Sequence, residues 1–77
     1  MPKGWEIRAG RSLLGWNTRE LAKRAGVDLS TIYRVEASGN KSARGQGRTL
    51  ENLITTLEKH GVEFIEDGVR LVRKPRR

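Results

Sequence analysis

Residues 18–35 read TRELAKRAGVDLSTIYRV, and the fold follows from this stretch. Two short helices that cross at a tight turn need a small residue at the crossing, a glycine in the turn and apolar residues that hold them together. Ala22 supplies the small residue and Gly26 the turn. The apolar residues fall at the required positions, and they are Leu21, Val27, Ile32 and Val35. The sequence therefore predicts a helix-turn-helix in this stretch.

Capping residues mark the ends of both helices. Asn17 is a favourable N-cap, and Glu20 three residues later gives the spacing of a capping box. Gly26 ends the first helix, because glycine readily takes the positive φ that follows many helices. Asp28 caps the second helix, which we expect over residues 29–37.

One further helix is expected on each side of this pair. Apolar residues at helical spacing predict a helix over residues 5–14, which Gly15 then stops. A fourth helix is expected to begin at the N-cap Thr49 and to end before Gly61. Its apolar stripe consists of Leu50, Leu53, Ile54 and Leu57. Residues 38–48 are expected to form a loop rich in Gly, Ser and Asn.

After Gly61 the apolar period changes from that of a helix to that of a strand. The alternating apolar residues are Val62, Phe64, Val69 and Leu71. The dipeptide Asp67-Gly68 between them is a strong hairpin signal, so we expect a β-hairpin over residues 62–73. A two-stranded hairpin is only marginally stable alone, so we expect this one to pack against a second copy as a dimerisation element.

The predicted architecture is mainly α, a compact four-helix helix-turn-helix domain with a C-terminal β-hairpin. We divide the chain into a DNA-binding domain at 1–61, the hairpin at 62–73 and a basic disordered tail at 74–77. Seventy-seven residues suffice for one small core and leave little room for a second domain or a deep substrate cavity.

Composition argues against an enzyme. Cysteine is absent, so disulfides, thiolate nucleophiles and cysteine zinc sites are excluded. His60 is the only histidine, so a two-histidine zinc site is excluded as well. We expect no enzymatic activity, no cofactor and no metal. No apolar run approaches the roughly 18 residues of a membrane span, and we expect a soluble cytoplasmic protein with no membrane partner.

The charge is strongly basic and unevenly distributed. The formal net charge is +7 and the sequence pI is about 10.9, which favours a polyanionic partner. Residues 1–48 carry ten basic and four acidic side chains, whereas residues 49–68 carry one basic and five acidic. Residues 69–77 add five basic side chains and no acid. The first part of the chain and its tail are therefore suited to an anion, and the segment between them is not.

Residues 7–39 read IRAGRSLLGWNTRELAKRAGVDLSTIYRVEASG. This run resembles the phage repressor/Cro (Xre-like) helix-turn-helix family of bacterial and phage transcriptional regulators. With the expected fourth helix, the resemblance covers residues 5–61. It implies a compact domain that binds double-stranded DNA as a homodimer on a palindromic operator and acts as a small repressor or controller in the nucleoid. The hairpin and the long basic loop depart from the phage repressors, which continue with a further helix.

The resemblance assigns the second helix of the motif to the major groove, with its N-terminal residues at the base edges. Its candidate base contacts are Leu29, Ser30, Thr31 and Arg34. Arg34 can fork to O6 and N7 of a guanine, while Leu29 can touch a thymine methyl group. The two hydroxyl residues between them can donate or accept a hydrogen bond. For Arg34 the alternative is a phosphate contact or a solvated side chain.

Phosphate contacts would orient the protein without reading sequence. Thr18 matches the residue that reaches the DNA backbone in the resembling repressors, and Asn17 caps a helix end whose free N–H groups favour a phosphate. Tyr33 either contacts a phosphate or covers the junction with the fourth helix. The basic loop either follows the backbone, with Arg44 as a candidate for the minor groove, or contributes only general attraction. The candidate phosphate contacts are Asn17, Thr18, Arg19, Tyr33, Lys41, Arg44 and Arg48.

The resemblance also implies an ion pair between Arg11 and Glu36. In the resembling repressors these positions tie the first helix to the end of the recognition helix. We expect the pair to be structural and not catalytic.

A protein-interaction role on the same fold is the alternative function. An antitoxin or antiactivator would use another protein as its main partner, and the acidic segment 49–68 would be its natural surface. The helix over 29–37 favours DNA instead, because it carries Ser30, Thr31 and Arg34 on its outer face and no acid there beyond its cap.

Overall fold

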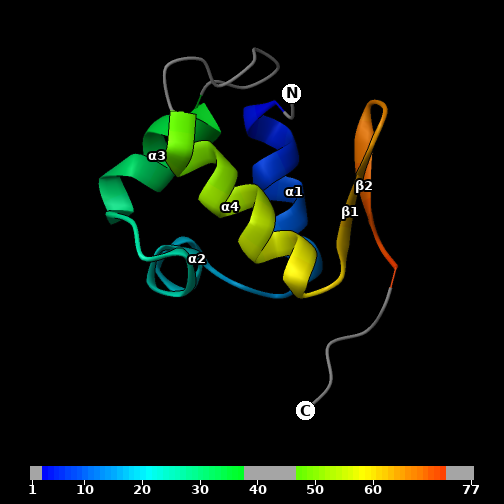
Figure 1. Ribbon diagram of the computed structural model, residues 1–77, viewed down its shortest axis with the longest axis horizontal. Helices are drawn as coiled ribbons and strands as arrows, with labels where there is room; N and C mark the ends of the chain where they lie inside the picture. The colour runs from blue at the N-terminus through cyan, green and yellow to red at the C-terminus, as the bar shows by residue number, and fades with distance from the viewer. Residues whose placement is uncertain (1–2, 38–46, 73–77) are drawn as a thin grey trace.

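The computed structural model describes residues 3–37 and 47–72. Four helices and a two-stranded hairpin make up this part of the chain, as the sequence predicts (Figure 1). The hairpin lies on one side of α1 and α4, and α3 lies on the other. The tail at 74–77 and most of the loop at 38–48 lie outside the described residues. The elements are α1 Gly4–Leu13, α2 Thr18–Ala25, α3 Leu29–Ala37, α4 Gly47–Lys59, β1 Val62–Ile65 and β2 Gly68–Leu71.

The ends of α2 are those that the capping residues predict. The side-chain oxygen of Asn17 accepts a hydrogen bond from the backbone N–H of Glu20 at 2.8 Å. Gly26 ends the helix with a φ of 70°, in the left-handed region that glycine adopts without a steric penalty. The carboxylate of Glu20 lies 2.6 Å from Nε of Arg24, one turn further along. Asn17 thus caps α2 as expected, whereas the Glu20 side chain binds Arg24 and does not complete the capping box.

Two helices begin earlier than the sequence predicts. α1 begins at Gly4, because the Glu6 carboxylate accepts a 2.7 Å hydrogen bond from the backbone N–H of Lys3 and so satisfies a donor ahead of the first turn. α4 begins at Gly47, so Thr49 lies inside its first turn and is not its N-cap. The first N–H groups of a helix have no partner within the helix and can bind water, so an exposed helix end can extend by a residue or two without a side-chain cap.

The hairpin turn lies one residue earlier than predicted. Ile65 pairs with Gly68, so the turn residues are Glu66 and Asp67, and Gly68 opens β2. Asp67 adopts the left-handed conformation, with φ 63°. Aspartate tolerates this region better than most residues, so Gly68 is not needed in the turn and pairs with Ile65 instead. The pairing extends beyond the strands, because the Val72 N–H donates to the carbonyl of Gly61 at 2.8 Å.

One hydrophobic core joins the helices to the hairpin. Gly10 on α1 is the point of closest approach. A Cβ atom there would lie 3.1 Å from Cγ1 of Val62 and 3.3 Å from Cδ1 of Leu57. Because Gly10 has no side chain, α4 and the beginning of β1 can pack closely against α1. The buried apolar residues are Ile7, Leu21, Ala22, Ile32, Val35, Leu50, Leu53, Leu57 and Val62.

The two faces of the hairpin differ in character. Phe64, Val69 and Leu71 are partly buried and pack against the core. On the other face, Glu63 pairs with Arg70 across the strands at 2.6 Å, and both side chains are exposed. The inner face therefore anchors the hairpin to the helices, and the outer face is left to solvent or to a partner.

Gly26 offers a clean test of the helix end. A Cβ atom at this position would meet nothing within 4 Å, so only the backbone conformation opposes substitution. We expect Gly26→Ala to lower the free energy of unfolding by about 1–2 kcal/mol. Gly68→Ala is the matched control, because its Cβ would make an ordinary 3.9 Å contact with Ile65 and no positive φ is involved. Urea denaturation of both variants measures the difference, and equal losses would contradict the assignment.

Candidate nucleic-acid interface

α3 presents a polar, cationic face to solvent and an apolar face to the core. Ile32 and Val35 are buried, whereas Ser30 and Arg34 are exposed. Tyr33 lies beside them with 56% of its surface exposed. Leu29 and Thr31 are only partly buried, and Leu29 packs against the core. Of the four candidate base contacts, Ser30 and Arg34 are therefore the most accessible.

The candidate phosphate contacts come from three places in the chain. Asn17 and Arg19 are exposed around the beginning of α2, and Thr18 there is partly buried. Arg48 is exposed in the first turn of α4. Tyr33 is exposed on α3. The other two candidates, Lys41 and Arg44, lie outside the described residues.

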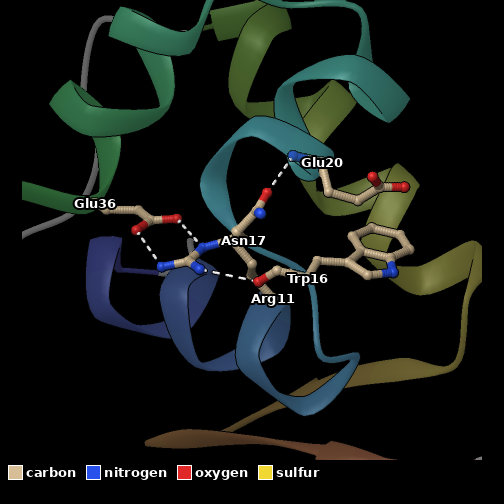
Figure 2. Close-up of polar contacts among 5 residues, drawn as sticks. All are labelled: Arg11, Trp16, Asn17, Glu20 and Glu36. Atoms are coloured by element: carbon tan, nitrogen blue, oxygen red, sulfur yellow. Dashed lines mark hydrogen bonds and ion pairs between the residues drawn. The ribbon is translucent and has the colours of Figure 1, made fainter.

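Arg11 and Glu36 come together in a two-fold hydrogen-bonded ion pair (Figure 2). Nε of Arg11 lies 2.8 Å from Oε2 of Glu36, and Nη2 lies 2.9 Å from Oε1. The two side chains are only 13% and 9% exposed. Glu36 is the only acidic residue within α3, so this pair turns the helix's one negative charge inward and neutralises it.

The same guanidinium group makes a third contact that the sequence analysis did not identify. Nη1 of Arg11 donates to the backbone carbonyl of Trp16 at 3.0 Å, and the Trp16 N–H donates back to the Arg11 carbonyl at 3.1 Å. Trp16 precedes the N-cap of α2, where an apolar residue often packs against the helix as a hydrophobic staple. The position of Trp16 directly before the N-cap is the sequence signal from which its packing role could have been recognised.

The indole ring of Trp16 lies between two other elements. Figure 2 shows the ring pointing away from the Arg11–Glu36 pair. Cζ of Arg24, on α2, lies 4.7 Å from the ring centroid, in a cation–π geometry. The His60 ring, just after α4, approaches edge-on with centroids 4.8 Å apart and planes at 74°. Nδ1 of His60 in turn lies 2.8 Å from the carbonyl of Thr56, to which it donates, so the histidine is fixed to the end of α4.

In residues 3–37 and 47–72, no three His, Asp or Glu side chains gather closely enough to hold a metal ion. None of the helices in the same ranges is long and apolar enough to cross a membrane.

Comparisons with protein-family models, with curated proteins and with solved structures found no match. The side chains of α2, α3 and the link before them are therefore the basis on which a function is assigned.

The inward ion pair should matter much more than the exposed one. Removing the Glu36 carboxylate leaves the Arg11 charge in a largely buried place without its partner, so we expect Glu36→Ala to cost about 2–3 kcal/mol of unfolding free energy. Glu63→Ala removes a carboxylate from an exposed pair of the same type and should cost less than about 1 kcal/mol. Thermal unfolding of both variants checks the contrast. Similar losses would show that burial does not set the strength of the Arg11–Glu36 pair.

Proposed function

We propose that this protein is a sequence-specific double-stranded DNA-binding regulator of the phage repressor/Cro type, acting through a helix-turn-helix formed by α2 and α3. One observation carries the proposal. α3 exposes Ser30 and Arg34, while its single acid, Glu36, is held inward by Arg11. A helix that enters the major groove needs donors at its surface and no negative charge facing the phosphates.

The connection between α2 and α3 supports this proposal. α2 and α3 pack against each other and are separated only by residues 26–28, with Gly26 in the left-handed conformation. Figure 1 shows α2 nearly along its axis while α3 lies across the view, as expected for two helices that cross at a steep angle. Such an arrangement would let one helix enter the groove while the other lies across the backbone.

The DNA backbone would be contacted around the beginning of α2. Asn17 and Arg19 are exposed there, next to N–H groups whose dipole favours an anion. Arg48 adds an exposed cation at the beginning of α4. These contacts would orient α3 without reading the sequence, and Lys41 and Arg44 are further candidates for the same role.

The hairpin is the proposed dimer contact. Its outer face carries the exposed Ile65, and Val72 at its root is 57% exposed. Pairing with the same elements of a second chain would present two copies of α3 to a palindrome, roughly 34 Å apart. A chain that binds operators in this way works in the cytoplasm, associated with the nucleoid.

A protein-interaction role is the second candidate. The observation in its favour is that α4 and the hairpin turn carry exposed acids, which phosphates would repel. These acids are Glu51, Glu58, Glu66 and Asp67. An antitoxin or antiactivator would present these acids to its partner.

Selection on random-sequence duplex DNA tests the DNA-binding role. We expect enrichment of a palindrome with half-sites about one helical turn apart. The affinity should fall with salt, with a log–log slope of about −0.9 for each phosphate contact. The absence of enrichment, with only general salt-sensitive binding, would favour the protein-interaction role.

Arg34 is expected to read one base pair in each half-site. Arg34→Ala should weaken binding to the selected site by about 1–3 kcal/mol and relax the preference at that base pair. Arg8→Ala is the matched control, because it removes the same charge from an exposed position of α1 that is not among the proposed contacts. Competition binding with single-base variants of the site measures both. An unchanged preference in the Arg34 variant would remove this residue from the base contacts.

Light scattering coupled to gel filtration tests the dimer contact. We expect a concentration-dependent dimer, and we expect Ile65→Lys to shift it towards the monomer by placing a charge in the contact. Ser12→Lys introduces the same charge at an exposed position of α1 and should leave the dimer intact. A wild-type monomer at high concentration and on DNA would contradict the role of the hairpin.

A further inference from the structure

We infer that Trp16 is a positioning residue for DNA binding. It holds the beginning of α2, where the phosphate contacts are proposed, in a fixed place relative to α3 and α4. This inference rests on the proposed function and adds a residue that touches no DNA itself. It draws on a juxtaposition that the sequence analysis did not identify, namely Trp16 with Arg11, Arg24 and His60.

The backbone of Trp16 is fixed to α1 and, through Arg11, to α3. Both its carbonyl and its N–H pair with Arg11, at 3.0 and 3.1 Å. The same guanidinium group binds the carboxylate of Glu36 at the end of α3. Movement of the link at Trp16 would therefore disturb a largely buried ion pair, which costs more than bending an exposed loop.

The ring of Trp16 is fixed to α2 and α4. Arg24 covers the ring from α2, and Glu20 holds Arg24 in place at 2.6 Å. His60 meets the ring from the end of α4 and is itself bound to the Thr56 carbonyl. Trp16 thus contacts side chains or backbone of α1, α2 and the end of α4, and it reaches α3 through one intermediate group.

The next two residues are among the candidate phosphate contacts. Asn17 caps α2 and Thr18 begins it, so their placement follows directly from that of Trp16. A groove-binding protein needs its phosphate contacts and its base contacts in register on one rigid body. If the ring is lost, the beginning of α2 samples several positions and only a fraction of the molecules is competent to bind. The apparent affinity falls by that fraction.

The central variants are Trp16→Leu and Trp16→Phe. We expect Trp16→Leu to weaken binding to the selected site by about 3- to 10-fold, the scale of one lost aromatic contact. Non-selected DNA should be weakened by a similar factor, because phosphate contacts carry no sequence preference. Trp16→Phe retains a ring for Arg24 and His60 and should recover most of the affinity. Trp5→Leu is the matched control, since Trp5 is the other tryptophan and lies on α1.

A second variant keeps the test decisive if Trp16→Leu fails to fold. His60→Leu removes only the ring that approaches Trp16 from the end of α4, and it should weaken both DNA classes by the same factor. In a Trp5→Phe background the indole N–H resonance of Trp16 reports the contact directly. His60→Leu should shift this resonance, and so should binding of the selected DNA.

Each outcome decides the question. Uniform weakening in the Trp16 and His60 variants, with the Trp5 control unchanged, supports the inference. Binding within about twofold of wild type in a folded Trp16→Leu protein overturns it and leaves the proposed function intact. A changed base preference also overturns it, because Trp16 would then act through α3. If the wild-type chain binds no DNA, the proposed function fails and the inference fails with it.

Discussion

The guanidinium group of Arg11 is the contact on which the arrangement of the helices depends. It binds both oxygens of Glu36 and the carbonyl of Trp16, so one side chain of α1 joins the link before α2 to the last turn of α3. A largely buried ion pair of this kind adds little net stability compared with apolar residues of the same size. The pair has a larger effect on geometry, because a planar guanidinium group with fixed donors binds its partners in only one orientation.

The direction of the Glu36 side chain determines both the buried ion pair with Arg11 and the charge of the exposed face of α3. Because Glu36 is turned towards Arg11, the exposed positions of α3 keep only neutral and basic side chains. The acids of the second half of the chain lie on α4 and around the hairpin turn. Figure 1 places α3 and the hairpin on opposite sides of α1 and α4. The exposed acids of the hairpin turn therefore lie across these helices from α3.

The features that depend on neighbouring residues could be predicted from the sequence. Asn17 and Gly26 bound α2 as expected, because caps act over three or four residues. The turn of the hairpin was misplaced by one residue, since aspartate and glycine both tolerate the left-handed conformation and only the ladder decides between them. The contact between Trp16 and His60 could not be predicted, because His60 follows the far end of α4 and no local pattern brings the two rings together.

The close approach at Gly10 has a consequence for the order in which the molecule assembles. The bare face of α1 at this glycine is covered by Leu57 and Val62, which come from the second half of the chain. Helix contacts between neighbours such as α2 and α3 close short loops, whereas this contact must close a loop of most of the chain, at a greater entropic cost. During synthesis, the apolar face of α1 at Gly10 therefore stays uncovered until Leu57 and Val62 have left the ribosome. The beginning of the hairpin thus completes the core around α1.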